Sequence, residues 1–561
     1  MDIQRSGGSL RAGPGDAVTE RVDAVGLSRS SGTGEAAEGE KSSVDWLQAR
    51  QGVRRAASLA IDISLLGLTA AIFLVLNKRF YSSGIGYDEE FFAWGGWCIR
   101  KGLAPYRDFI EFKPPLVFIT HALAQALFGF KNMGYRTYFA AFPLVSFLAL
   151  QTSLVARRVP RFMALGMMVA VIWLFVNPAW HDTALSDCES IGISYYMLGL
   201  ALFLWEGRSI KLTTALGGFF MACCALSKEP FIPAVLATWL GCFFLRGTPS
   251  PSRASTLLFA RYSIIGAAVL AAALCIYMVP TGAMRAYIEM ARDYARIYRD
   301  PVRSYCVAVG VYLPSTPMGD LTVAWDKMRA AFLNEAVLGY LAPLAVPGAV
   351  FAFRRSPALL ATMGAACLAG IWAVTASKCQ WVHYYNMPMA GMIFVLVAGL
   401  DSMKGPLRAA HPRVLAGVSV AIVLLVYWHT SPDIEREAKA QYTRLPWHEP
   451  APGLLAFIEQ NTVPSDRIFT TGPPILYAQA DRVSAVRQSN IIDEILGLYD
   501  GETDEEKLRP IYLQLVKNKP KVVFLDPEHG NRKGRHNRVL LMPFLAEFKY
   551  KKINDYLYLR P

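Results

Sequence analysis

Long apolar runs separated by short polar loops fill this chain from about residue 56 to residue 429. A helix needs roughly 20 apolar residues to cross the hydrocarbon core of a bilayer. Hydrophobic residues make up 53% of the 561 residues, and their division into separate runs predicts a polytopic α-helical membrane protein rather than a soluble enzyme. We expect about eleven transmembrane helices, at residues 56–76, 135–156, 161–178, 190–206, 211–226, 230–245, 262–280, 336–353, 357–376, 384–400 and 413–429.

A further apolar stretch, residues 116–130, is shorter than the others, and the distribution of charge decides how to interpret it. If this stretch does not cross the membrane, thirteen Lys and Arg residues fall in five alternate loops, and the short loops between them carry only Lys228 and Lys378. Short cytoplasmic loops are enriched in Lys and Arg. We therefore expect an interfacial helix on the outer face, with the N-terminus cytoplasmic and the C-terminus outside.

The two ends of the chain differ in composition from its centre. Residues 1–50 are rich in Gly, Ser, Arg and Glu, and are predicted to be a disordered cytoplasmic segment. Residues 51–430 form the transmembrane domain. Residues 431–561 alternate helix-like and strand-like runs, which is typical of a small soluble α/β domain. No Gly-rich phosphate motif follows its strands, so we assign no catalysis to it. The predicted helices are 454–460 and 505–518, and the predicted strands are 467–471, 521–526 and 555–560.

The segment after the first apolar run carries the most informative residues. Asp88, Glu89 and Glu90 stand a few residues past that run, and Lys113 opens a Lys-Pro-Pro turn after a charged and aromatic loop. Ionisable side chains at the membrane boundary are costly to keep there, so they are a functional-site hypothesis by default. The plainer alternatives are an acidic first turn of a surface helix over 88–101 and a lysine that snorkels to the interface.

These residue types suit the transfer of a glycosyl group away from a phosphate. The acceptor hydroxyl must lose its proton as it attacks, and a carboxylate such as Asp88 can accept that proton. The departing phosphate must be stabilised, which Lys113 and Lys228 can do. A single base on the face opposite the leaving group predicts inversion at the anomeric carbon, by analogy with inverting glycosidases.

Other predicted outer loops hold further candidates. Arginines alternate with tyrosines between residues 280 and 334, which indicates either a phosphate-binding lid or an interfacial helix with aromatic anchors. The remaining loops could be merely hydrophilic, with Lys228 paired to the neighbouring Glu229 and His383 hydrogen-bonded at the interface. The candidates in these loops are Arg292, Arg296, Asp187, Glu189, Lys228, Lys378, His383 and Tyr384.

The order of motifs in the first outer loop resembles the GT-C superfamily of membrane glycosyltransferases. An acidic cluster at 88–90 is followed by LAPYRDF (103–109), KPPL (113–116) and FG (128–129). Protein O-mannosyltransferases and the bacterial transferases that add aminoarabinose to lipid A are similar in this order. Their layout is similar too, with about eleven crossings, surface helices in a large first outer loop and an outer C-terminal domain.

This resemblance implies roles for individual residues. Asp88 matches the first-loop aspartate that activates the acceptor, and Glu89 is the second member of that acidic pair. Lys113 matches the lysine near the carrier phosphate, and Lys228 resembles a loop lysine that also faces the phosphate. A second acidic position corresponds to Asp187 or Glu189, and the basic-aromatic start of a late helix corresponds to Lys378, His383 and Tyr384.

The resemblance also implies an activity and a location. Such enzymes move a hexosyl or pentosyl unit from a polyprenyl-phosphate donor to an envelope glycan, lipid or protein outside the cytoplasm. We therefore expect a protein of the bacterial inner membrane with its active site in the periplasm, no nucleic-acid partner and a part in cell-envelope biogenesis. The lipid A enzymes have a glutamate before the KPPL lysine that helps to hold zinc. Phe112 stands there in this chain, so we assign no metal ligands and leave a divalent metal open.

Two other functions stay open at this point. A transporter or flippase of a lipid-linked sugar would carry ionisable residues near the bilayer midplane, often in two repeated halves. The predicted crossings hold few charges besides Asp62, and no internal repeat is evident. A polysaccharide polymerase or ligase would use a pyrophosphate-linked oligosaccharide, and only the first-loop motif argues against it.

Overall fold

The structure is a computed structural model of the chain. It describes residues 35–77, 87–130, 132–176, 185–205, 209–246, 253–292, 335–376, 387–439, 453–487, 505–526 and 541–561. The chain divides into two compact units, Met1–Asp62 and Ile63–Pro561. Helix α1 spans Glu35–Leu76, so it begins about twenty residues before the predicted start.

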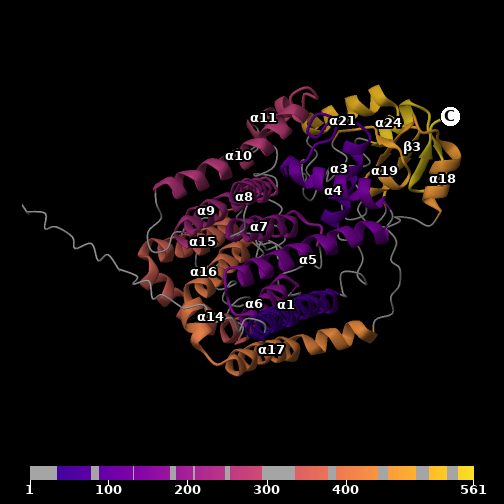
Figure 1. Cartoon of the computed structure of the whole chain (residues 1–561). Coiled ribbons are helices and arrows are strands. Elements are labelled where there is room, and N and C mark those ends of the chain that lie inside the picture. Colours follow the sequence, from indigo (N-terminus) through magenta and orange to yellow (C-terminus); the bar gives the residue numbers. More distant parts are fainter. Residues whose placement is uncertain are drawn as a thin grey trace, which may run out of the picture. The chain divides into compact units, whose positions relative to one another are not determined.

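A bundle of long helices follows (Figure 1). Every apolar run that we expected to form a helix does so. The helices are α5 (Asn132–Ala156), α6 (Arg161–Val176), α7 (Cys188–Leu204), α8 (Ile210–Ala225), α9 (Ile232–Arg246), α10 (Arg253–Met278), α14 (Glu335–Arg355), α15 (Pro357–Ala376), α16 (Met387–Ala409) and α17 (Pro412–Lys439). Helix α10 begins nine residues before the predicted start.

Five of the described helices are long and apolar enough to cross a membrane. They are Arg50–Leu76, Gly134–Ala156, Ser255–Met278, Pro357–Val374 and Met387–Ala409, and five further apolar helices are shorter. The structure thus has the helical character predicted for a membrane protein, while the number of eleven crossings stays a prediction.

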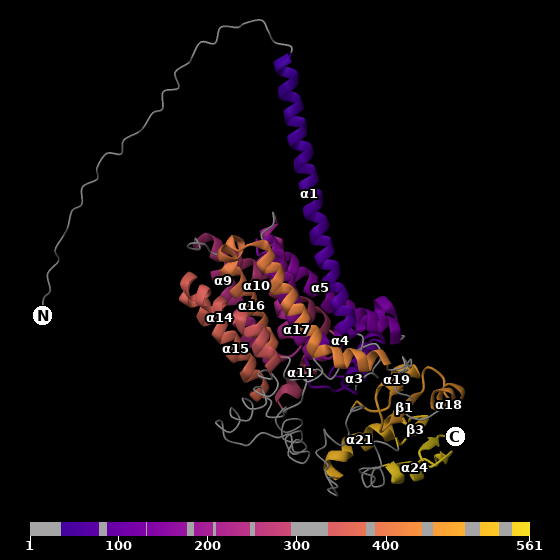
Figure 2. The same ribbon diagram turned by 90° about the horizontal axis from the view of Figure 1, so that it is seen from below.

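Small residues bring neighbouring helices of the bundle into close contact. Helix α8 packs against both α7 and α10 (Figure 1), and α15 packs against both α9 and α16 (Figure 1 and Figure 2). A Cβ atom on Gly266 of α10 would lie 1.7 Å from the Ala215 carbonyl oxygen of α8, and one on Gly218 would lie 2.0 Å from the Ser263 oxygen. Only glycine permits this approach, which is how membrane helices gain packing without a hydrophobic driving force between them.

Two shorter helices form the segment between α1 and α5. These are α3 (Tyr87–Arg100) and α4 (Pro115–Phe128), which match the surface helix predicted over 88–101 and the stretch predicted as an interfacial helix. Two successive glycines let α3 lie directly on α4: a Cβ on Gly95 would meet the Phe118 ring at 2.4 Å, and one on Gly96 would lie 2.7 Å from the Ala122 nitrogen. The two helices therefore fix each other's position through backbone contact.

The C-terminal part contains a five-stranded sheet in the order β2-β1-β3-β5-β4. Strand β1 is parallel to β2 and β3, whereas β5 is antiparallel to β3 and β4. The strands are β1 (Arg467–Thr470), β2 (Val483–Ser484), β3 (Val522–Phe524), β4 (Lys551–Lys552) and β5 (Leu557–Leu559), and the helices are α18 (Leu454–Asn461), α19 (Ile475–Gln479), α21 (Glu505–Asn518) and α24 (Met542–Glu547). The predicted helices and strands of this region are confirmed, with boundaries shifted by at most two residues.

Each face of this sheet is apolar. Phe469, Val523 and Tyr558 are paired in register across three strands, and they pack in one cluster with residues of α21 and α24. The alternate residues, among them Ile468 and Val522, pack with residues of α18 and α19 in the main cluster. This follows from the period of two in a strand, which sends successive side chains to opposite faces. Helix α19 also lies against α3 (Figure 1).

Candidate functional site

The three acidic residues in the first turn of α3 differ in their exposure to solvent. Asp88 is exposed, whereas Glu89 and Glu90 are 3% and 2% exposed. Acidic residues are favoured at a helix N-terminus because the first N–H groups point toward them. That explains why the turn is acidic, but it does not explain burial of two carboxyl groups. Burial of a charge requires partners.

Glu89 finds a partner on a segment almost one hundred residues away. The Ser186 hydroxyl donates a hydrogen bond to Glu89 Oε1, and the Ser186 amide makes a longer contact of 3.4 Å with the same oxygen. The carbonyl oxygen of Ser186 in turn lies 2.9 Å from His121 Nε2 of α4. Ser186 is therefore held between α3 and α4.

The residues after Ser186 begin helix α7 with carboxyl groups. Asp187 caps that helix, and its Oδ1 accepts a hydrogen bond of 2.6 Å from the Ser190 amide, as a helix N-cap should. Burial raises the pKa of Asp187 well above its usual range, and the negative charge of Glu189 raises it further. Within the part of the chain that the structure describes, Asp187 Oδ2 is buried and accepts no hydrogen bond.

Glu189 forms an ion pair with Lys228. The Lys228 ammonium donates to Glu189 Oε1, and the Cys188 thiol lies 2.9 Å from Oε2. Both charged side chains are nearly buried, at 1% exposure for Glu189 and 5% for Lys228. A buried pair of this kind stabilises little by itself, but removing one partner leaves an uncompensated charge.

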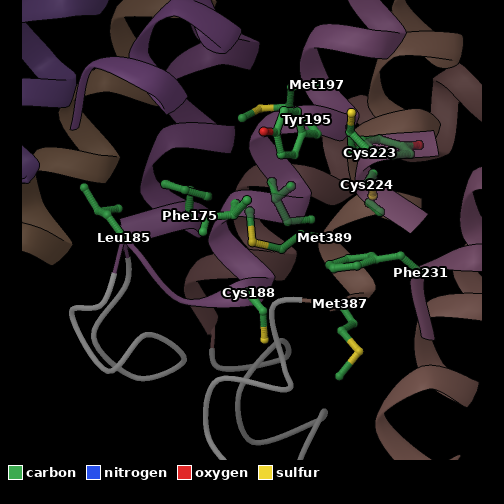
Figure 3. Packing of buried hydrophobic residues seen from close by; sticks show 14 of the residues in the cluster. Phe175, Leu185, Cys188, Tyr195, Met197, Cys223, Cys224, Phe231, Met387 and Met389 are labelled. Carbon is green, nitrogen blue, oxygen red and sulfur yellow. The ribbon is translucent and has the colours of Figure 1, made fainter. Parts of the chain in front are cut away.

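A glycine makes this pairing possible. Lys228 precedes the short helix η1 (Glu229–Phe231), and the ring of Phe231 packs on α7. A Cβ atom on Gly192 would lie 2.6 Å from Phe231 Cε2, so α7 and η1 approach only because Gly192 has no side chain. Figure 3 shows Phe231, Cys188 and Met387 toward one end of the buried cluster, with Tyr195 and Met197 at the other.

The turn before α4 supplies a second lysine. Lys113 is half-buried, and its carbonyl oxygen accepts a hydrogen bond of 2.8 Å from the Tyr106 hydroxyl. Burial raises the pKa of the Cys188 thiol, and the positive charges of Lys228 and Lys113 oppose that rise. Burial raises the pKa of Glu111, while the charge of Lys113 opposes that rise. Lys228 therefore reaches the first turn of α7 through its ion pair with Glu189, and the charge of Lys113 acts on the same turn.

Asp88 belongs to the same group of charges. Its negative charge adds to the rise in the pKa of Glu111, and the charge of Glu89 acts in the same way on Asp187. Hydrogen bonds and an ion pair bring four of the residues that we singled out from the sequence together at the start of α7: Glu89, Asp187, Glu189 and Lys228. Their catalytic and binding roles stay predictions.

The arginine-rich loop is described only in its first part. Helix α11 (Ala283–Arg292) places Tyr287 against Tyr106, with 4.8 Å between ring centroids. Arg292 is exposed at its last turn. Four other candidates, Arg296, Lys378, His383 and Tyr384, lie outside the described residues.

Several residues of the site were not expected to take part in it. Ser186 and Tyr106 carry no charge, and Glu111 stands one position before Phe112, the residue that replaces the family's glutamate. The LAPYRDF motif contains Tyr106, which was the one signal available. Nothing in the sequence connects Ser186 to Glu89, because their contact depends on tertiary structure.

The described residues contain no group of three or more His, Cys, Asp or Glu side chains placed to hold a metal ion. Each acidic side chain instead has its own partner: Glu89 accepts from Ser186, Glu189 pairs with Lys228, and Asp187 caps α7.

Comparison with known proteins identifies the fold. The structure of ArnT from Cupriavidus metallidurans in the apo state aligns with a TM-score of 0.50 and 13% identity, covering 90% of this chain and 98% of that one. ArnT bound to undecaprenyl phosphate aligns with a TM-score of 0.47, 13% identity and the same coverage. The archaeal oligosaccharyltransferase AglB from Archaeoglobus fulgidus, in complex with an inhibitory peptide and a dolichol-phosphate, aligns with a TM-score of 0.47 and 14% identity, covering 90% of this chain and 74% of that one.

The similarity to apo ArnT, at 13% identity, shows that the chain shares the fold of that protein. No family model matches the sequence, and no curated protein matches it. The resemblance stated from the first-loop motifs is therefore confirmed for the fold.

Proposed function

We propose that this protein is a glycosyltransferase that moves a sugar from a polyprenyl-phosphate donor to an acceptor in the cell envelope. The observation that carries the proposal is that Glu89, next to the exposed Asp88, and Lys228 each bond to a residue at the start of α7, namely Ser186 and Glu189. Transfer from a phosphate needs a base for the acceptor and positive charge for the leaving group. The ArnT-like fold supports the same activity.

Asp88 is the best candidate for the base. It is exposed, so an incoming hydroxyl can reach its carboxylate, whereas Glu89 and Glu90 are buried. The departing phosphate needs no general acid, because it is a good leaving group. Attack by an acceptor activated on one face, with the phosphate leaving from the other, inverts the anomeric carbon.

The two lysines differ in what they can offer a phosphate. Lys113 is half-buried, with its main chain fixed by Tyr106, and we assign it direct contact with the donor phosphate. Lys228 is already paired with Glu189, so its charge contributes to the local potential rather than to a new ion pair. Arg292 and Arg296 would add charge from the arginine-rich loop, and Lys378, His383 and Tyr384 would line the site from the start of α16.

The substrate and location follow the same reasoning. We propose a hexosyl or pentosyl donor, an acceptor that is an envelope glycan, lipid or protein, and a protein of the bacterial inner membrane. Its N-terminus would be cytoplasmic, and its site and C-terminal domain periplasmic. The distribution of basic residues supports this orientation: Arg157 and Arg355 both donate to the carbonyl oxygen of Leu245, next to Arg246 at the end of α9, so basic residues of three helices gather in one place.

The test is sugar transfer by the purified protein in detergent, with polyprenyl-phosphate sugars as donors and envelope extracts as acceptors. We expect a glycosylated product, detected by mass spectrometry, with the anomeric configuration opposite to that of the donor. Transport of the lipid-linked sugar into vesicles with no covalent product would favour the flippase instead. Activity only with a pyrophosphate-linked oligosaccharide would favour a polymerase or ligase.

A further inference from the structure

We propose that Glu89 is a positioning residue that holds Ser186, and with it the acidic start of α7, in place for the reaction, and that it is not a second base. This inference rests on the proposed glycosyl transfer and refines the role first expected for Glu89. Its basis is the hydrogen bond from the Ser186 hydroxyl to Glu89 Oε1. Glu89 is 3% exposed, whereas Asp88 beside it is exposed.

The chemistry of Ser186 fixes the direction of each hydrogen bond. A carbonyl oxygen can only accept, so the imidazole nitrogen that faces the Ser186 carbonyl must carry a proton. That nitrogen is His121 Nε2, at 2.9 Å. In a neutral ring Nδ1 then has a free lone pair, and the Tyr135 hydroxyl, 2.5 Å away, donates to it.

Ser186 is thereby fixed from three helices. Its hydroxyl is bonded to Glu89 of α3, its carbonyl to His121 of α4, and His121 is oriented by Tyr135 of α5. All four side chains are buried. Networks of buried, satisfied polar groups hold one arrangement more firmly than single bonds do.

The position of Ser186 decides where the next three residues point. Asp187 caps α7 directly after it, and Glu189 in the first turn reaches Lys228. A shift of Ser186 would move these carboxyl groups relative to Lys113 and Asp88. Misplacement of a reacting geometry by about 1 Å can lower a rate by about a hundredfold.

The side chain of Glu89 is also poorly placed to act as a base. A base must exchange its proton with an incoming hydroxyl, but Glu89 is enclosed and its Oε1 already accepts from Ser186. Glutamine keeps a carbonyl oxygen at the same place, so Glu89→Gln can still accept from the Ser186 hydroxyl, although it could not act as a base. This difference makes the proposal testable.

The experiment compares transfer kinetics of Glu89→Gln, Glu89→Ala, Ser186→Ala and Asp88→Asn with the wild type in detergent. We expect Glu89→Gln to keep its rate within about tenfold, and Asp88→Asn to lose at least about a hundredfold. Glu89→Ala and Ser186→Ala should each lose roughly ten- to a hundredfold. Their combination should lose no more than either alone, because both remove the same bond.

The pH profile supplies a readout that a loss of folding would not change. In Glu89→Gln and Ser186→Ala the acidic limb of kcat/KM should keep the wild-type midpoint, because Asp88 still carries it. A Glu89→Gln variant as inactive as Asp88→Asn, or a displaced acidic limb, would overturn the proposal. If Glu89→Gln does not fold, a Ser186→Ala variant with the wild-type rate overturns it equally well. A wild-type rate in Asp88→Asn would instead refute the proposed base and leave the Glu89–Ser186 coupling to be judged by the double variant.

Discussion

Arg487 of the C-terminal part donates a hydrogen bond from Nη2 to the Tyr106 carbonyl oxygen, at 2.5 Å, and the Ile110 amide donates one of 3.1 Å to the Arg487 carbonyl. Tyr106 has φ +65°, in the left-handed region that a tyrosine rarely adopts. Its hydroxyl holds the carbonyl of Lys113. The C-terminal part is therefore linked by two residues to the lysine that we assign to the donor phosphate.

Replacement of Arg487 should weaken donor binding. In Arg487→Ala the strained Tyr106 loses an external partner, so we expect the KM for the lipid-linked donor to rise roughly tenfold, as for the loss of a hydrogen bond to a charged group worth about 1.5–3 kcal/mol. Steady-state kinetics at saturating acceptor measure this. Arg509→Ala, an exposed arginine of α21, is the matched control. An unchanged donor KM in Arg487→Ala would show that the link has no influence on the site.

Replacement of Gly192 should separate Glu189 from Lys228. In Gly192→Ala the new methyl group meets Phe231 at 2.6 Å, and we expect a loss of about 1–3 kcal/mol in stability, as for overpacking of a core, together with reduced transfer. Thermal unfolding in detergent and transfer rates measure the two effects. The control is Gly364→Ala in α15, where a Cβ meets nothing within 4 Å. Equal behaviour of the two variants would contradict the close approach of η1 to α7.

The pH dependence of the protein's stability should reveal the raised pKa of Glu111. Burial raises its pKa, so the folded protein binds this proton more tightly than the unfolded chain does. Its contribution therefore favours folding at low pH, and that contribution is lost as the pH rises above about 4.5 through the raised folded-state pKa. Glu111→Gln should raise the unfolding temperature at pH 7 more than at pH 4.5. The exposed Glu459→Gln should show no such difference, and the absence of one in Glu111→Gln would be contrary to this assignment.

Asp401 should be important for the stability of the bundle. It is fully buried and pairs with Arg157 at 2.7 Å, Arg355 at 2.7 Å and Lys404 at 3.2 Å. Asp401→Ala leaves the buried Arg157 without its carboxylate, and we expect a loss of about 3–5 kcal/mol. Unfolding in detergent measures this, with the exposed Arg408→Ala as control. A loss below about 1 kcal/mol would show that the cluster tolerates the missing charge.

The sequence predicts the helices of the bundle well, because apolar runs define them. Helix α7 was expected over 190–206 and spans Cys188–Leu204. The early starts of α1 at Glu35 and α10 at Arg253 were missed for one physical reason. Their first turns are polar, and hydropathy marks the part of a helix that lies in lipid, not the helix itself.

The sequence predicts candidate residues of the site, but not the hydrogen bond and the ion pair that join them. Asp88 and Lys113 stand out as ionisable groups at the membrane boundary. The bonds from Ser186 to Glu89 and from Lys228 to Glu189 join residues 97 and 39 positions apart. Such contacts depend on how α3, α7 and η1 pack, which Gly95, Gly96 and Gly192 permit. In a single sequence nothing distinguishes these glycines from others in helices.

The most direct test of the account separates donor binding from transfer in a single turnover with labelled polyprenyl-phosphate sugar. The account predicts that Asp88→Asn binds the donor as the wild type does but transfers at less than about one hundredth of its rate. Lys113→Ala should bind the donor at least about tenfold more weakly. Wild-type binding and transfer in both variants would contradict the claim that Asp88 and Lys113 serve one sugar-phosphate site.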